Sequence, residues 1–480
     1  MYAGDEKVPS WFWLQGLFTT IYEEGYYMSH KNGNFSSSLG FILACVGSAV
    51  GLGNIWMFPY RLGQFGGAAF LVPYLFFICL FGLTGLSAEF AIGRKAKTGT
   101  LGSYELCWAH RGKGAVGRFL GWIPLMGSLG IAIGYSIIIG WVLRSLGGSL
   151  TGAILTEDSA AYFAQATGSF GSLPWHLAVV LITVIILVTG SVTQIERANR
   201  VMMPVFFVLF TVLAVRVFFL PGASDGYNFL FVPKWERLLD VNTWVMAMGQ
   251  AFFSLSITGS GMIVYGSYLN KKADIVGSSM RTALFDTVAA LLSALAIMPA
   301  VFAFGIEPAA GPSLMFITMP KVFASMSFGN IIGLVFFLLV LFAALTSAIS
   351  LMECCVSIIQ DRYDFSRKKC CVLIFGGIAL LGIPCSLGFG VLDFITPLGL
   401  SILDFFDFMT NSIMMPISAA CTCLLIIKVT GFKTVTDEVE YSSKFKRKKA
   451  YLFCMKYVVV PGLLIILISS VLSTMGIISI

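Results

Sequence analysis

Two short stretches gather glycine and hydroxyl-bearing residues inside otherwise apolar sequence. Residues 47–54 read GSAVGLGN, and residues 254–261 read SLSITGSG. Each glycine weakens a helix by about 1 kcal/mol relative to alanine, so both stretches favour unwound backbone. Freed carbonyl and hydroxyl oxygens can bind a cation, and freed amides at a helix start can bind an anion. Close helix packing through small residues is the alternative interpretation of either stretch alone.

Composition places these stretches inside a membrane. Of the 480 residues, 57% are hydrophobic and only 11% are charged, whereas soluble domains carry about 25% charged residues. We therefore predict an all-α integral membrane protein with the lipid bilayer as its solvent, and exclude a soluble protein, a disordered chain and a nucleic-acid binder. Eleven apolar spans are predicted, at residues 39–62, 69–92, 118–146, 175–192, 199–220, 241–268, 279–304, 330–358, 371–390, 402–428 and 452–478.

The distribution of lysine and arginine predicts the orientation of the chain. With a cytoplasmic N-terminus, 25 of the 31 basic residues fall in inner segments and six fall outside. Inner loops of membrane proteins carry this excess of positive charge. We therefore expect a multi-pass protein of the plasma membrane. Its N-terminus is cytoplasmic and its C-terminus lies outside, because the number of spans is odd.

The two glycine-rich stretches lie in spans 1 and 6, five spans apart. Breaks at corresponding positions of two five-helix halves are typical of inverted repeats with a binding site near the bilayer midplane. Residues 1–27 are interpreted either as an interfacial helix or as an extension without function. The predicted organisation is an inner tail at 1–34, five-helix repeats at 35–220 and 221–430, and a basic inner loop with helix 11 at 431–480.

Three motifs in these spans resemble signatures of the neurotransmitter:sodium symporters, particularly of their bacterial amino-acid members. The motifs are GSAVGLGNIWMFP at 47–59, GQAFFSLS at 249–256 and AALTS at 343–347. The resemblance implies a leucine-transporter-like fold of 5+5 inverted repeats, with about 11 transmembrane helices and with helices 1 and 6 broken. It also implies sodium-coupled import of a neutral amino acid, without an organic cofactor.

The resemblance further implies one or two bound sodium ions. Taken alone, a Thr-Ser pair such as Thr346-Ser347 is better explained by hydrogen bonds to the preceding helical turn. The first implied ion site consists of hydroxyls and carbonyls of Gly47, Val50, Ala343, Thr346 and Ser347. The second consists of the Ala49 carbonyl with Asn54, Ser254 and Asp286.

Asp286 departs from the family pattern, which has an asparagine at this position. A carboxylate buried in a membrane costs several kcal/mol unless it is paired, and sodium would be such a partner. Some family members need chloride here to balance the charge of sodium. Since Asp286 brings its own negative charge, we predict chloride-independent transport. A proton-carrying role and a purely structural role are the other interpretations of Asp286.

The substrate class is inferred from charge. The free amides of Leu52 and Gly53 would face an anion, and Tyr135 resembles the tyrosine that clasps a substrate carboxylate. Gly51 stands where monoamine-carrying relatives have an aspartate, so the substrate should bring its own carboxylate. We expect a large aliphatic or aromatic amino acid. The resemblance places the remaining substrate contacts at Ser48, Ile131, Phe253, Ser254, Ser256, Gly259, Ser347, Ser350 and Leu351.

Gate residues are also implied by the resemblance. Asp407 resembles the acidic residue of the outer gate, and Asp361 and Tyr268 resemble residues of the inner gate. The arginine that usually pairs with the outer acid is replaced by Met57. Arg61 lies four residues further on, on the same helical face, and is the predicted substitute.

Two other functions stay open. A proton-coupled amino-acid transporter of the same fold would use Asp286 as the proton carrier and would work without sodium at low pH. A sensor that binds an amino acid without moving it is compatible with the missing gate arginine. An enzyme is disfavoured, because the chain has only three histidines and shows no nucleophile–base arrangement or phosphate-binding loop.

Overall fold

The computed structural model describes most of the chain, and within the described residues it contains helices and no strands. The predicted inner tail up to residue 33 and the predicted pocket residue Gly259 lie outside that part. The described ranges are 34–156, 158–189, 192–257, 260–305, 313–363 and 365–474.

The first half of the chain forms the five predicted spans. Helix 1 consists of two pieces bent by 61°. The helices are α2 (Ser38–Ala49) with η1 (Gly53–Met57) and α3 (Phe58–Gln64), α4 (Ala68–Phe81) with η2 (Gly82–Leu86) and α5 (Ser87–Ala96), α7 (Gly114–Thr151), α10 (Leu173–Thr189) and α11 (Val192–Phe218). Shorter helices connect them: α6 (Thr100–Ala109), α8 (Ala153–Thr156), α9 (Ser159–Thr167), α12 (Ala223–Phe231) and η3 (Trp235–Leu239).

The second half repeats this order and adds a last helix. Its spans are α13 (Val241–Ser254) with α14 (Gly261–Ser267), α15 (Ile275–Ala303), α17 (Gly329–Tyr363), α18 (Arg367–Leu387), and α19 (Ile402–Asp407) with η6 (Phe408–Met414), α20 (Met415–Leu424) and η7 (Leu425–Thr430). The connecting and final helices are η4 (Leu314–Thr318), α16 (Met319–Ala324), η5 (Pro397–Gly399), α21 (Phe432–Ser442), and α22 (Lys448–Cys454) with η8 (Met455–Val459) and α23 (Val460–Thr474).

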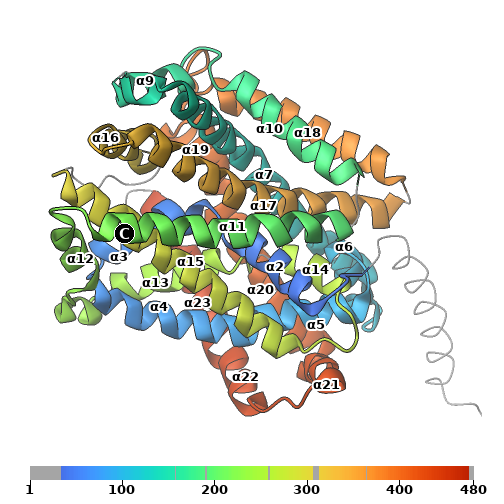
Figure 1. Ribbon diagram of the computed structural model, residues 1–480. Coiled ribbons are helices and arrows are strands. Elements are labelled where there is room, and N and C mark those ends of the chain that lie inside the picture. Colours follow the sequence, from blue (N-terminus) through green and yellow to red (C-terminus); the bar gives the residue numbers. More distant parts are fainter. Residues whose placement is uncertain are drawn as a thin grey trace, which may run out of the picture.

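Helix length and hydropathy support the membrane prediction. Among the described residues, eight helices are long and apolar enough to cross a bilayer, or nine when the two pieces of helix 1 are taken as one span. The remaining two of the eleven predicted spans are helix 6, which consists of two pieces, and helix 4, the short α10. Figure 1 shows α11 crossing the length of the bundle, with α10 beside α18 along one edge and α21 and α22 at the opposite edge. The third helices of the two halves, α7 and α17, pack against each other.

Helix α2 lies on α11 through two glycines spaced seven residues apart. A Cβ at Gly40 would lie 1.8 Å from Glu196 Oε1, and a Cβ at Gly47 would lie 1.8 Å from Asn199 Oδ1. Glu196 also accepts hydrogen bonds from the start of α2, at 2.7 Å from the Ser36 amide and 2.6 Å from its hydroxyl. The inner piece of helix 1 is therefore held on helix 5 by two polar side chains.

Helix α14 packs closely on α5 at the end of the bundle that is predicted to be cytoplasmic. A Cβ at Gly93 would lie 1.9 Å from the Ile263 carbonyl oxygen, so a larger residue does not fit there. Lys97, just beyond α5, donates hydrogen bonds to the carbonyls of Ser267 and Leu269 at 3.1 and 2.8 Å. The end of helix 2 thus satisfies carbonyls at the end of the inner piece of helix 6.

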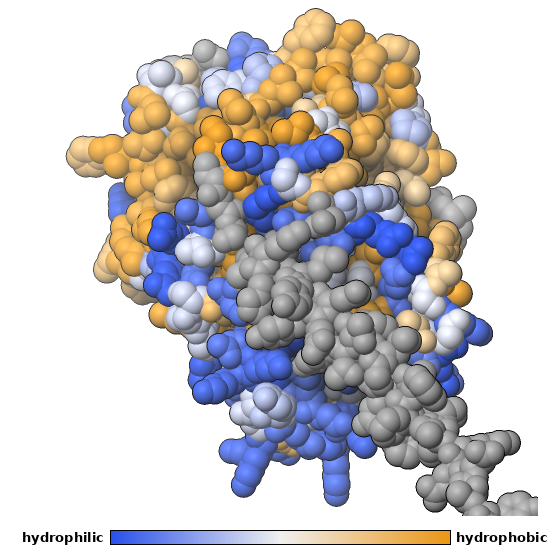
Figure 2. Space-filling model, turned by 90° about the vertical axis from the view of Figure 1, so that its right-hand side faces the viewer, coloured by the Kyte–Doolittle hydropathy of each residue, from blue (hydrophilic) through white to orange (hydrophobic). Residues whose placement is uncertain are grey.

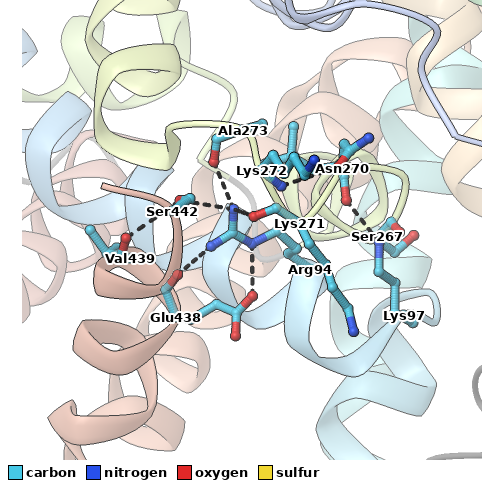
Figure 3. Close-up of polar contacts among 11 residues, drawn as sticks. Arg94, Lys97, Ser267, Asn270, Lys271, Lys272, Ala273, Glu438, Val439 and Ser442 are labelled. Atoms are coloured by element: carbon cyan, nitrogen blue, oxygen red, sulfur yellow. Dashed lines mark hydrogen bonds and ion pairs between the residues drawn. The ribbon is translucent and has the colours of Figure 1, made fainter. Parts of the chain in front are cut away.

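Arg94 joins this pair to α21. Its side chain is fully buried and forms an ion pair of 2.7 Å with Glu438. It also donates to the carbonyl of Ala273 at 2.7 Å, to that of Lys271 at 3.3 Å and to the hydroxyl of Ser442 at 3.2 Å. Figure 3 shows Arg94 between α21 and the linker that follows α14. One guanidinium therefore fixes three segments that are distant in sequence.

Figure 2 shows this end of the molecule. Hydrophilic residues cover its middle and lower parts, and hydrophobic residues flank the upper part. The basic side chains that are exposed here agree with the predicted cytoplasmic orientation, which stays a prediction. They include Lys95, Arg111, Lys113, Lys271 and Lys272.

We predict that Arg94→Gln lowers the melting temperature of the purified protein by several degrees. Breaking a buried ion pair costs about 3–5 kcal/mol, and this substitution also removes the bonds to Ala273 and Lys271. Arg118→Gln is the matched control, because its pair with Glu105 is partly exposed and exposed pairs contribute about 0–1 kcal/mol. Equal melting temperatures for the two variants would contradict the assignment.

Candidate functional site

Helix 1 is interrupted at the predicted position. Helix α2 ends at Ala49, and Val50 adopts an extended conformation with ψ of 111°. Helical structure resumes at Gly53. Across this gap, Asn54 folds back on Gly51, because Gly51 N–H donates to Asn54 Oδ1 at 3.2 Å. The carbonyls at the end of α2 therefore lack the helical amides that would normally bind them.

Helix 6 is interrupted beside this gap. Helix α13 ends at Ser254 and α14 begins at Gly261. Between them, Ser256 adopts a left-handed conformation with φ of 52°, which is costly for a residue with a Cβ. The Ser256 hydroxyl donates to the Ser48 carbonyl at 3.1 Å. The two interruptions therefore contact each other directly, and both flank the same interior space.

The residues predicted for the first ion site lie close together in the structure. Ser347 Oγ lies 3.1 Å from the Gly47 carbonyl oxygen and 3.0 Å from that of Val50. Thr346 Oγ1 donates to the Ala343 carbonyl at 2.9 Å, which is the hydrogen bond to the preceding turn that a lone Thr-Ser pair suggests. A hydroxyl that donates still has lone pairs to offer. We call these oxygens of Gly47, Val50, Ala343, Thr346 and Ser347 the sodium cluster, after the ion predicted from the sequence. They carry no formal charge and are donors of the kind that hard cations prefer.

The second predicted ion site centres on Asp286, which is fully buried on α15. Asn54 Nδ2 donates to Asp286 Oδ1 at 2.8 Å and to Ser254 Oγ at 3.1 Å. The Ser254 hydroxyl donates to Asp286 Oδ2 at 2.6 Å. Within the described residues Asp286 forms no ion pair, so its charge has only neutral partners. A small cation fits this arrangement. Ala49, the remaining predicted ligand, lines the adjacent cavity.

A cavity of about 540 Å³ opens beside both clusters. Beside the cavity the Leu52 amide donates to Tyr135 Oη at 3.0 Å, and the Tyr135 hydroxyl also contacts the Ser347 hydroxyl. A Cβ at Gly51 would lie 2.5 Å from Tyr135 Oη, which explains the small residue there. The predicted substrate contact Ser254 is not among the residues that line the cavity. The other described substrate-site residues all line the cavity, namely Ser48, Leu52, Gly53, Ile131, Tyr135, Phe253, Ser256, Ser347, Ser350 and Leu351.

The cavity extends to the predicted outer gate residues. Arg61 and Asp407 both line it, but they form no ion pair in the part of the chain that the structure describes. Arg61 Nη1 donates to Gln250 Oε1 at 2.9 Å, and Asp407 accepts from Asn411 Nδ2 at 2.5 Å. Gln250 and Asn411 were not predicted as gate partners. The position of Gln250 in the sixth-helix motif was the available signal.

Two aromatic side chains, one of them the predicted inner-gate residue Tyr268, pack together at the end of the bundle that is predicted to be cytoplasmic. The buried rings of Phe35 and Tyr268 lie 6.3 Å apart. Tyr268 donates to Glu353 Oε1 at 3.1 Å, and Glu353 forms an ion pair of 2.6 Å with Arg367. Sequence reasoning did not assign Glu353 and Arg367 to this gate. The available signal was a carboxylate in an apolar span, which requires a partner.

Asp361, the other predicted inner-gate residue, contacts a different segment of the chain from the one that Tyr268 contacts. Its carboxylate accepts the Gly99 amide at 2.7 Å and the Thr98 hydroxyl at 3.1 Å. The N-terminal position that the resemblance pairs with Asp361 is residue 32, outside the described residues. In the structure Asp361 therefore anchors the connection between α5 and α6.

Comparison with known proteins agrees with this geometry. A family model described as the sodium:neurotransmitter symporter family matches residues 32–165 and 156–478. A crystal structure of MhsT in complex with L-phenylalanine is 37% identical, with a TM-score of 0.81, and the match covers 91% of this chain and 99% of that one. An uncharacterized sodium-dependent transporter of Bacillus subtilis, YhdH, is 36% identical over 400 residues, which cover 82% of this chain and 87% of the relative.

A second uncharacterized sodium-dependent transporter, from Haemophilus influenzae, is 31% identical over 451 residues, covering 91% of this chain and 97% of the relative. The chain belongs to the sodium:neurotransmitter symporter family. It is therefore a multi-pass membrane transporter that uses sodium, and not an enzyme. The broken helices and the leucine-transporter-like fold predicted from the sequence are confirmed.

We predict that Gly47→Ala raises the sodium concentration that gives half-maximal thermal stabilisation by at least about tenfold. The new Cβ would collide with Asn199 and would lie 3.1 Å from Thr346 Cβ, so the sodium cluster must deform. Gly376→Ala is the control, because a Cβ there meets nothing within 4 Å. Unchanged sodium titration of Gly47→Ala would contradict the predicted position of the ion.

Proposed function

We propose that this protein imports a neutral amino acid together with one or two sodium ions, by alternating access and without chloride. The observation that carries the proposal is the contact between the two helix interruptions, where Ser256 binds the Ser48 carbonyl beside the oxygens gathered around Ser347. The similar MhsT structure, which was solved with L-phenylalanine, supports an amino acid as the substrate.

The charges around the cavity favour a zwitterion. Tyr135 and the amides that follow the break in helix 1 present hydrogen-bond donors to a carboxylate. Gly51 has no side chain to neutralise a free amine. The substrate amine would face the freed carbonyls near Ser256 and the end of α2. An amine without a carboxylate would leave the donors of Tyr135 and Gly53 unused.

The wall of the cavity favours a large apolar side chain. Ile131, Ile138, Phe253 and Leu351 line it together with small residues, and burial of apolar surface provides the main binding energy in such pockets. Ser350 also lies in this wall, but its hydroxyl already contacts Tyr265 Oη at 2.5 Å. The Ser350 hydroxyl also donates to the Thr346 carbonyl at 3.0 Å, so its proton is already used within the wall.

Sodium supplies positive charge to oxygens that the broken helices expose. The hydroxyls of Thr346 and Ser347 belong to α17, and the carbonyls of Gly47 and Val50 belong to helix 1. A sodium ion bound at this cluster would therefore connect helix 1 with α17, and loss of the ion would remove this connection. Release of the substrate at the predicted inner side also requires the contacts of Tyr268 with Glu353 to part.

A panel of ligands tests the proposal. We expect phenylalanine and leucine to raise the melting temperature of the purified protein in sodium buffer but not in choline buffer. Phenethylamine, which lacks the carboxylate, should have no effect. Tyr135→Phe should weaken the response to phenylalanine about tenfold or more, because a hydrogen bond to a charged group contributes about 1.5–3 kcal/mol. Stabilisation by phenethylamine equal to that by phenylalanine would refute the substrate class.

Asp286 generates a second prediction. Its carboxylate already supplies negative charge at the second ion site, so uptake into proteoliposomes should continue when chloride is replaced by gluconate. Asp286→Asn removes that charge, and its residual uptake should be lower and should rise when chloride is added. Loss of uptake by the unmodified protein in gluconate would contradict this role for Asp286.

The burial of Asp286 without an ion pair also favours a second candidate function, coupling to protons. A proton on this carboxyl would remove the buried charge as effectively as a cation does. The proton-coupled mechanism predicts amino-acid uptake at pH 5.5 in the absence of sodium. The sodium-coupled mechanism predicts none under that condition.

A further inference from the structure

Asn199 on α11 has a buried oxygen without a partner. The side chain is fully buried, and its Nδ2 donates to the Ile195 carbonyl at 2.9 Å. This bond fixes the orientation of the amide, because the reversed orientation would place two carbonyl oxygens against each other. Asn199 Oδ1 then has no hydrogen-bond partner among the described residues. Buried polar atoms in this state are rare and call for an explanation, such as an unseen ion.

The Asn199 oxygen lies against Gly47, one of the residues that form the sodium cluster. A Cβ at Gly47 would lie 1.8 Å from Asn199 Oδ1 and 3.1 Å from Thr346 Cβ. Asn199 Oδ1 and the Thr346 side chain therefore both lie next to Gly47, on the side of the cluster that faces α11. Only a glycine at position 47 leaves room for the amide to approach.

We infer that Asn199 Oδ1 supplies an oxygen to the sodium ion of the Gly47–Thr346–Ser347 cluster, from the side of α11. The inference rests on the proposed function, because it requires sodium at that cluster. An amide carbonyl is a hard, neutral donor of the kind that such cations prefer. It strengthens the site without adding a charge that would stay buried after the ion leaves.

With Asn199 as a ligand, the ion would connect helix 1 and α17 with a third element, helix 5. Glu196, three residues before Asn199, already holds the start of α2 on the same face of α11. An ion bound in the sodium cluster would then strengthen the packing of α2 on α11 at both Gly40 and Gly47.

The test is a sodium titration of purified protein without substrate, in which the melting temperature reports binding. Asn199→Leu keeps the volume and removes the oxygen. It should raise the half-saturating sodium concentration about tenfold or more, since even partners outside the ligand shell change metal affinity about 10–100-fold. Asn199→Asp, measured at pH 8.5, should lower it several-fold. Thr243→Val is the matched control, because it removes a fully buried hydroxyl that also lacks a partner, and should change nothing.

Thr346→Ala separates this inference from the proposed function. If Thr346→Ala loses sodium binding while Asn199→Leu titrates like the unmodified protein, the role of Asn199 is refuted and the sodium cluster stands. If Thr346→Ala also binds sodium normally, the cluster itself is refuted. If the leucine and aspartate variants weaken sodium binding equally, Asn199 acts through packing alone and the inference fails. Should the leucine variant not fold, the direction of the aspartate variant decides.

Discussion

Backbone polar groups cannot stay unpaired in hydrocarbon, and this constraint governs the whole structure. An interrupted helix is tolerated at membrane depth only where other groups satisfy its freed carbonyls and amides. Here the interruptions of helices 1 and 6 satisfy each other in part, through Ser256 and the Ser48 carbonyl. The remaining carbonyls, at Gly47 and Val50, accept from the Ser347 hydroxyl of α17, so the rest of the bundle must bring α17 and helix 1 together.

The same constraint gives a physical reason for coupling. In the structure the Ser347 hydroxyl is shared among several carbonyls, and among the described residues the hydrogen-bond partners of Asp286 are neutral. Both arrangements gain more from a cation than from further neutral donors. A bound substrate would complete the set by meeting Tyr135. In the proposed mechanism, ion and substrate would therefore stabilise the same arrangement of helices 1, 6 and 8, and each would favour binding of the other.

The sequence predicts these central features because they depend on local chemistry. Gly47, Gly51 and Gly53 within one span indicate an interrupted helix. The resemblance to the family assigned Tyr135 to the substrate carboxylate, which the Leu52 and Gly53 amides would also face. Contacts of Arg61 and Tyr268 were less predictable. Their partners, Gln250 and Glu353, are set by the tilt and rotation of distant helices, which an apolar pattern does not determine. The orphan oxygen of Asn199 depends likewise on how closely α2 approaches α11.

The most direct test of this account is binding of radiolabelled sodium to the purified protein. We expect saturable binding that an added large neutral amino acid strengthens. In a protein carrying both Thr346→Val and Ser347→Ala, the substrate-strengthened component should disappear, although the protein stays folded by circular dichroism. Saturable binding that keeps its affinity and its response to the amino acid in the double variant would show that the interrupted helices do not form the ion site.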